Sequence, residues 1–184
     1  DGLESLTSVG SNLNIYENDT LTSIDGLSSL TSVGDSLNIE SNETLTSLDG
    51  LSSLTSVGGY LNIYENDALT SIDGLSSLTT VGGDLLLWGN ISLTDLGGLA
   101  NLTSVGGDLS LVYNAHPTLD GLESLTSVGG LTFTDAPAKP TGAKSIRPFS
   151  TQHSTTKDAR VRENRCDFQR WANIAHIPTG WHGS

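Results

Sequence analysis

The chain has 184 residues, a formal net charge of −13 at pH 7, 35% hydrophobic residues and one cysteine. Residues 1–138 contain 18 Asp or Glu and no Lys or Arg, while all eight basic residues lie between 139 and 170. Because contacts to phosphates need Lys or Arg, the acidic part is not a general nucleic-acid binder. No apolar run of about 20 residues occurs, so the sequence predicts no membrane span.

A single unit is repeated through residues 1–138, and residues 139–184 carry no copy of it. The copy at 50–73 reads GLSSLTSVGGYLNIYENDALTSID. Successive copies start 24 residues apart four times and then 23 residues apart, at Gly2, Gly26, Gly50, Gly74, Gly98 and Gly121. Because a fixed period of this length is typical of stacked repeats, we predict an all-β domain over 1–138 and a basic cap or tail over 139–184.

The apolar residues of the unit predict a flat coil with one short strand. Only residues 61–63 alternate between apolar and polar, which favours a strand at 61–64. The other apolar residues then point inward from the corners of the coil. Equivalent strands of neighbouring coils would pair in parallel about 4.8 Å apart, which gives a parallel β-solenoid of about six 24-residue coils.

Glycine and asparagine recur at fixed places in each coil. Glycine pairs stand just before the strand, at 58–59, 82–83, 106–107 and 129–130, where we predict a tight corner with positive φ. Asparagines follow the strand, at Asn18, Asn42, Asn66, Asn90 and Asn114. A buried amide there can bond the backbone of its own turn and of the next coil, so we predict an asparagine ladder.

The shared pattern, L-x-x-L-T-S-V-G-G-x-L-x-I-x-x-N-x-x-L-T-S-I, is similar to a leucine-rich repeat with one residue added after the asparagine. More closely, it resembles the receptor L domain. This resemblance implies a right-handed solenoid, secreted or at the cell surface, that serves in recognition and is not an enzyme. The flanking disulfides of receptor ectodomains are a point of difference, because this chain has a single cysteine.

Coil four departs from the pattern on the side of the strand that faces away from the core. The three preceding coils read LNIY or LNIE, whereas this one reads LLLW at 85–88. Large apolar side chains on a polar background are typical of binding surfaces, so we predict a ligand site for a protein or glycan. Its candidate residues are Tyr16, Tyr64, Leu86, Trp88 and Val112. A tail folded over this face would explain the same residues.

The function could also be structural or ice-interacting, through two regular threonine columns. The first column is Thr7, Thr31, Thr55, Thr79, Thr103 and Thr126, and the second is Thr22, Thr46, Thr70 and Thr94. We predict a structural role, because each threonine precedes a serine and then a core residue, unlike the Thr-x-Thr of flat ice-binding strands. Motifs of known catalytic or phosphate-binding sites are absent from the sequence, which favours a non-enzymatic protein.

Metal sites and cofactors are not expected. His153, Cys166, His176 and His182 have no zinc-site spacing, and the carboxylates of the turns lack the glycine-aspartate nonapeptide of calcium β-rolls, so solvated charges are favoured over calcium.

The sequence also allows a prediction for each end of the repeat array. Because the first coil starts at residue 1, its uncapped edge favours end-to-end or edge self-association. Apolar residues at helical spacing in 156–176 predict a helix that caps the last coil, the alternative being a non-native extension.

Overall fold

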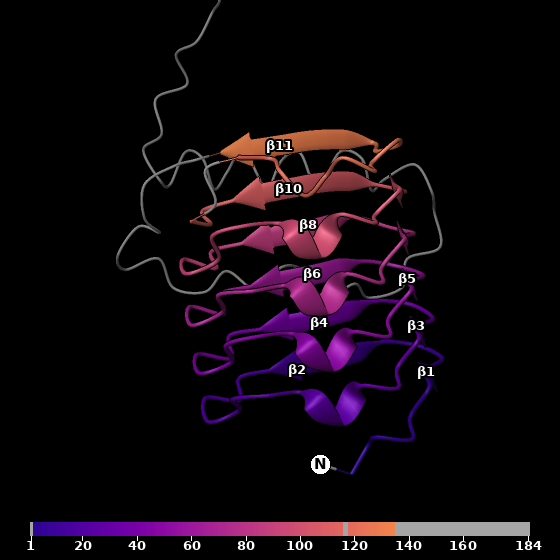
Figure 1. Ribbon diagram of the computed structural model, residues 1–184, viewed down its shortest axis with the longest axis vertical. Coiled ribbons are helices and arrows are strands. Elements are labelled where there is room, and N and C mark those ends of the chain that lie inside the picture. The colour runs from indigo at the N-terminus through magenta and orange to yellow at the C-terminus, as the bar shows by residue number, and fades with distance from the viewer. Residues whose placement is uncertain (1, 116–117, 135–184) are drawn as a thin grey trace, which may run out of the picture. The chain divides into compact units, whose positions relative to one another are not determined.

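The computed structural model describes residues 2–115 and 118–134, all of which belong to the compact unit Asp1–Lys139. The predicted helix in 156–176 lies outside the described residues. Figure 1 shows this unit as a stack of similar coils, each contributing one arrow to the same sheet. The predicted all-β parallel solenoid is therefore confirmed, with about five turns between the first and the last strand of that sheet.

Each of the first five coils contributes one strand to each of two parallel sheets, and the last described coil contributes a strand to the larger sheet alone. The larger sheet runs in the order β11-β10-β8-β6-β4-β2, with β2 (Leu13–Tyr16), β4 (Leu37–Glu40), β6 (Leu61–Tyr64), β8 (Leu85–Trp88), β10 (Asp108–Val112) and β11 (Gly130–Thr134). The smaller sheet runs in the order β1-β3-β5-β7-β9, with β1 (Ser8–Val9), β3 (Ser32–Val33), β5 (Ser56–Val57), β7 (Thr80–Val81) and β9 (Ser104–Val105). The predicted strand at 61–64 is confirmed as β6.

Short 3-10 turns form the third side of each complete coil. They are η1 (Asp25–Leu27), η2 (Asp49–Leu51), η3 (Asp73–Leu75) and η4 (Gly97–Leu99). In each of them the leucine is buried, so the turn delivers an apolar side chain to the core between the two sheets. A flat coil has no interior of its own, and its leucines are covered only by the coils above and below. In coil three, Leu51, Leu54, Leu61 and Ile63 are accordingly 0% exposed.

The predicted asparagine ladder is confirmed. Asn42, Asn66 and Asn90 are fully buried. The Asn66 side-chain oxygen accepts from the backbone N–H and from the amide group of Asn42, both at 3.1 Å. The Asn66 amide nitrogen donates to the Ile39 carbonyl at 3.0 Å in the coil below and to Asn90 Oδ1 at 3.3 Å in the coil above. The Asn66 amide therefore satisfies buried backbone groups of the coil below and bonds the ladder asparagine of the coil above.

The explanation predicted for the glycine pairs is wrong. Positive φ occurs at Gly2, Gly89 and Gly121, none of which belongs to a pair. The first glycine of each pair is required by the close approach of two coils. A Cβ added to Gly58 would collide with the Gly34 carbonyl, and one added to Gly82 would collide with the Gly58 carbonyl. These glycines thus let the backbone of one corner lie against the backbone of the next.

Positive φ is instead found directly after the strands of the larger sheet. Glu17, Ser41, Glu65 and Tyr113 have φ of 54°, 52°, 53° and 56°, and Gly89 holds the same place in coil four with a φ of 71°. The chain turns here so that the next residue, the ladder asparagine, points into the core. Since four of the five residues have a side chain, the glycine content of the sequence does not reveal this left-handed turn.

Candidate functional site

The candidate residues lie on the face of the larger sheet that points away from the core, here called the strand face. Alternation along the four-residue strands β2, β4, β6 and β8 sends the first and third residues inward and the second and fourth residues to the strand face. In the five-residue strands β10 and β11 the same alternation begins one residue later. The parallel register then builds two columns. One contains Asn14, Asn38, Asn62, Leu86 and Ser110, and the other contains Tyr16, Glu40, Tyr64, Trp88 and Val112.

The first column begins as a chain of hydrogen-bonded amides. Asn38 Nδ2 donates to Asn14 Oδ1, and Asn62 Nδ2 donates to Asn38 Oδ1, both at 2.7 Å. Leu86 follows Asn62 in register and has no amide, so it cannot continue the chain. The consensus residue would have extended this amide chain by one more member. In coil four, an apolar side chain therefore replaces the asparagine that would form the next side-chain hydrogen bond of the column.

The structure brings four of the five predicted residues together. Tyr64 pairs with Trp88, and Trp88 pairs with Val112, while Leu86 lies two residues before Trp88 on β8. Tyr16 is separated from this group by Glu40, which stands between it and Tyr64 in the same column. The group formed by Tyr64, Leu86, Trp88 and Val112 is called the apolar cluster below.

Residues 31–96 match the family model of the receptor L domain. This match confirms the resemblance drawn from the repeat pattern, and it covers most of coils two to four, including Tyr64, Leu86 and Trp88. Among curated proteins, no significant match to the chain was found. The receptor L domain is a non-enzymatic, ligand-binding family whose members are typically extracellular.

The exposed fraction of the side chains differs widely along the column that contains Tyr16, Tyr64, Trp88 and Val112. Tyr16 is 52% exposed, whereas Tyr64 is 3% and Val112 is 5% exposed. Leu86 and Trp88 are half-buried. Tyr64 and Val112 are thus much less accessible than their outward register predicts. Tyr16, Leu86 and Trp88 are thus the candidate residues that keep accessible surface on the strand face.

Tyr113 adds an aromatic side chain that sequence reasoning missed. Its ring lies edge-on to the indole of Trp88, with ring centroids 5.8 Å apart and an interplanar angle of 88°. Burial raises the pKa of the Tyr113 hydroxyl. Tyr113 occupies the left-handed position after the strand, where the other coils have Glu, Ser or Gly. The signal available in the sequence was a tyrosine at a repeat position where the other coils have a smaller or charged residue.

The electrostatic character of the strand face follows from composition. Residues 2–115 and 118–134 contain no Lys or Arg, and Glu17, Glu40 and Glu65 lie on or directly after strands of this face. Glu65 directly follows Tyr64 and is 7% exposed. In the part of the chain that the structure describes, the Lys, Arg, Asp and Glu positions are therefore all acidic.

Within the described residues, no group of three or more His, Cys, Asp or Glu is placed to hold a metal ion. The helices in the same part of the chain are three-residue turns, none of which could cross a bilayer. The acidic turns thus supply single carboxylates and no built cation site in the region that the structure describes.

The threonine columns make hydrogen bonds inside the protein. In the first column, the Thr55 hydroxyl donates to the Thr31 carbonyl at 3.0 Å, and the Thr79 hydroxyl donates to the Thr55 carbonyl at 3.0 Å. In the second column, the Thr70 hydroxyl donates to the Thr46 carbonyl at 3.2 Å. These bonds tie each coil to the one below it, which favours the structural role over an ice-binding one.

Proposed function

We propose that this chain is a non-enzymatic, extracellular recognition and adhesion module that binds a protein or glycan on the strand face. Within the apolar cluster, the half-buried Leu86 and Trp88 form the centre of the contact, and Tyr16 and the amide column form its polar side. The observation that carries the proposal is the interruption of the amide column at Leu86, beside Trp88 and in register with Asn62.

The physical argument concerns what coil four gives up. Its neighbours keep Asn38 and Asn62 in a hydrogen-bonded column, and nothing in the core requires coil four to differ, because Leu85 and Leu87 are fully buried as in the consensus. A half-buried leucine and indole forgo part of the roughly 1.5–3 kcal/mol that full burial of each side chain would provide. A partner that covers them would recover that free energy, and tryptophan is enriched at the centres of binding interfaces.

The family match supports the class of function. The receptor L domain is a ligand-binding family, and the matched residues 31–96 include the part of the strand face that carries Leu86 and Trp88. Because the described residues contain Asp and Glu but no Lys or Arg, we favour a neutral or basic ligand surface. A neutral glycan fits this description because sugar rings stack on aromatic side chains through their apolar faces, and so does a basic protein surface.

The test begins by screening the full chain against arrays of glycans and extracellular proteins, followed by affinity measurements on variants. Leu86→Asn restores the consensus and the amide column, so we expect unchanged or higher stability together with roughly 30-fold weaker binding, which corresponds to about 2 kcal/mol. Trp88→Ala should weaken binding at least as much, with some loss of stability because it removes the contact to Tyr113.

Thr132→Ala is the matched control, because Thr132 stands on the strand face of β11, in register with Ser110 and away from the cluster. It should leave affinity unchanged. Binding that is insensitive to both Leu86→Asn and Trp88→Ala would show that the ligand uses another surface.

A further inference from the structure

The amide column on the strand face ends at an open hydrogen-bond acceptor. Asn38 Nδ2 donates to Asn14 Oδ1, and Asn62 Nδ2 donates to Asn38 Oδ1. Because the nitrogen of Asn62 is turned toward β4, its Oδ1 is turned toward β8, where Leu86 is the neighbour in register. Leu86 has no side-chain donor, and Asn62 Oδ1 accepts no hydrogen bond within the described residues. Asn62 is half-buried, and this oxygen is accessible to solvent.

The rest of the column strengthens this acceptor. Its two hydrogen bonds, both 2.7 Å long, are at the short end of the range for N–H···O bonds. Hydrogen bonds in a row polarise one another, so each amide that donates becomes a better acceptor. Asn62 is the last amide of the row, and its Oδ1 therefore carries the added polarisation of both bonds. A ligand hydroxyl can extend the row without adding charge.

The turn after β8 lacks the carboxylates of the earlier coils. The left-handed position directly after the strand is Glu17 in coil one and Glu65 in coil three, but Gly89 in coil four. Two residues later the first three coils have Asp or Glu, whereas coil four has Ile91, which is 46% exposed. A cationic ligand therefore gains no ion pair from the turn that follows Trp88. An anionic ligand is disfavoured as well, because the described residues contain Asp and Glu but no Lys or Arg.

The apolar surface beside the acceptor is small. Leu86 and Trp88 are both half-buried, and a large aromatic side chain has only about 150–250 Å² of surface to bury. A standard protein interface covers about 800 Å² on each partner. The two side chains therefore fit one or two sugar rings better than they fit a protein surface.

A hexose ring with equatorial hydroxyls matches both parts of this surface. Its axial C–H groups make the two faces of the ring apolar, while its hydroxyl groups project from the edge. Asn62 and Trp88 lie on neighbouring strands and two residues apart along the strand direction, so their Cα atoms are about 8 Å apart. One ring can therefore lie on the indole while an edge hydroxyl donates to Asn62 Oδ1.

We propose that the strand face binds a neutral oligosaccharide of β-linked hexoses with equatorial hydroxyls, and that Asn62 Oδ1 is the acceptor that selects it. Trp88 and Leu86 supply the apolar contact for one ring. This assignment rests on the proposed function and narrows its ligand from a protein or glycan to one chemical class. Asn62 thereby joins the ligand site as a specificity-determining residue.

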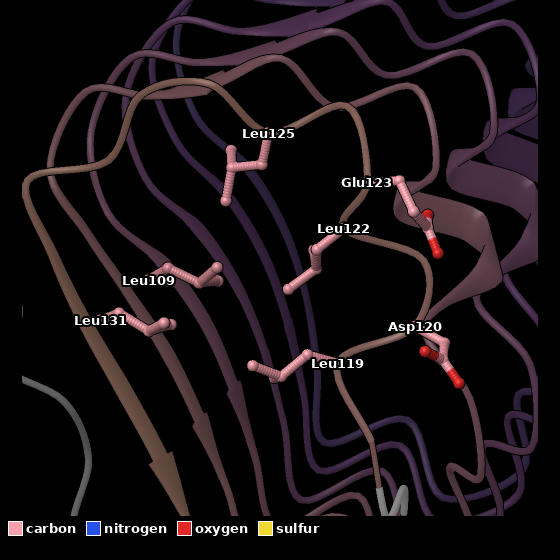
Figure 2. Close-up of a pocket in the computed structure, with 7 residues that line it drawn as sticks. All are labelled: Leu109, Leu119, Asp120, Leu122, Glu123, Leu125 and Leu131. Carbon is pink, nitrogen blue, oxygen red and sulfur yellow. The ribbon is translucent and has the colours of Figure 1, made fainter.

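A hollow of about 390 Å³ at the last described coil does not offer the same chemistry. Figure 2 shows Leu119, Leu122 and Leu125 pointing toward two strand leucines, with Asp120 and Glu123 directed outward beside them. Its lining residues include no amide side chain and no aromatic ring. The hollow therefore serves as an internal reference, because a probe that binds apolar surface without selectivity would reach it as well.

The test is an NMR titration of the isotope-labelled full chain with three neutral hexamers, which are cellohexaose, laminarihexaose and the hexamer of N-acetylglucosamine. We expect at least one of them to shift the amide signals of β6 and β8 with a saturating curve. The hexamer of glucosamine, which is cationic, should bind no more tightly than its neutral acetylated form. No shift with any neutral hexamer, shifts confined to residues 119–131, or binding of the cationic hexamer alone would overturn the proposal.

Two alanine variants separate the acceptor from the rest of the amide column. Asn62→Ala removes the acceptor and the hydrogen bond to Asn38, and it should weaken binding of the hexamer about fivefold. Asn14→Ala is the matched control, since it also removes one hydrogen bond of Asn38 but lies two strands away from β6. It should leave the affinity unchanged. Equal affinities of the two variants would contradict the role of Asn62 in recognition.

Two substitutions of Leu86 test the open acceptor itself. Leu86→Ala removes apolar contact but leaves Asn62 Oδ1 open, and it should weaken binding about fivefold. Leu86→Asn also supplies an amide donor to Asn62 Oδ1, as Asn62 does for Asn38, and it should weaken binding roughly 30-fold. Equal losses in the two variants would show that the acceptor does not contact the sugar.

The same titration separates the carbohydrate proposal from the proposed function. If no neutral hexamer binds, but an extracellular protein shifts β6 and β8 and loses affinity on Trp88→Ala, the strand face is a binding site and the carbohydrate proposal is wrong. If neither kind of probe shifts β6 and β8, the proposed function fails as well.

Discussion

The two end coils and the central coils have nearly the same sequence and very different environments. Residues 1–10 and 120–129 both read DGLESLTSVG, and residues 49–58 differ from them only by a serine in place of the glutamate. Yet Leu51 is 0% exposed, Leu3 is 54% exposed, and Leu122 is intermediate. The contribution of a residue to stability is therefore decided by its neighbours in the stack, and much less by the sequence of its own coil.

The same comparison holds for glycine and asparagine. A Cβ on Gly10 would have nothing within 4 Å, whereas one on Gly58 would meet the backbone of Gly34. Asn18 is exposed at the end of its ladder, and Asn66 is fully buried in the middle of it. Pairs of matched substitutions at centre and end can therefore separate the interactions between coils from those within a coil.

The largest difference is expected for leucine. Leu51→Ala removes side-chain atoms from a fully buried site and should lower the free energy of unfolding by about 3–4 kcal/mol. Leu3→Ala, at the equivalent place of the first coil, should lower it by less than about 1 kcal/mol because that side chain is already half in water. Denaturant unfolding of the two full-length variants measures both values. Similar losses would show that the first coil is covered.

Glycine provides the next comparison. Gly58→Ala pushes a methyl group against a backbone carbonyl that cannot swing away, so we expect a loss of about 2–3 kcal/mol. Gly10→Ala should be neutral within about 0.5 kcal/mol, since its Cβ would point into open space and its φ is not positive. Thermal unfolding followed by circular dichroism distinguishes the two. A tolerated Gly58→Ala would mean that adjacent corners can separate without loss.

The asparagine ladder should give a smaller contrast. Asn66→Ala removes the acceptor of the Asn42 backbone N–H and the donor to the Ile39 carbonyl, which leaves buried polar groups without these partners. The expected loss is about 2 kcal/mol. Asn18→Ala should lose about 1 kcal/mol or less because one side of Asn18 faces no further coil in the described structure. Hydrogen exchange at the Asn42 amide gives a local readout, and protection unchanged by Asn66→Ala would argue against the ladder.

The smallest effect concerns pH, and here both ends should behave alike. Backbone N–H groups, foremost that of Gly2 for Glu4 and that of Gly121 for Glu123, lower the pKa of each carboxyl group below its usual value. A lowered folded-state pKa means that the stabilisation is present above the pKa of the unfolded chain and is lost as pH falls through the folded pKa. NMR titration should show both glutamates ionising below an unfolded reference peptide. A normal pKa at one end alone would reveal a different local turn there.

The repeat pattern predicts those parts of the fold that every coil shares. The strand at 61–64 and the buried asparagines were predicted because alternation and period are visible in one dimension. The second sheet was missed since its strands, such as Ser56–Val57, contain two residues and leave no alternation to detect. The reason for Gly58 was misjudged because contact between two corners depends on the distance between coils, which no single coil encodes.

The candidate site was predictable in register but not in exposure. Trp88 and Val112 are neighbours because equivalent positions of a 24-residue period stack, and the sequence is sufficient for that inference. The low exposure of Tyr64 and Val112 was not predictable, because alternation along a strand indicates only which side of the sheet a residue faces. Tyr113 was missed because it lies one residue beyond the strand, where a reversal of the backbone brings its ring to Trp88.

The contact between glycine corners also governs how such a chain can change in length. Inserting one residue between Gly34 and Gly58 would remove Gly58 from its contact with Gly34 and shift every later residue out of register with the preceding coil. Adding a whole coil preserves each glycine and asparagine contact. The one shortened coil follows this rule, because its missing residue falls between Asn114 and Gly121, after the ladder residue and before the next turn. Gene duplication in units of one coil would thus lengthen the strand face in steps of about 4.8 Å. We therefore expect relatives of this chain to differ in length by whole coils, with the same spacing of side chains along the strand face.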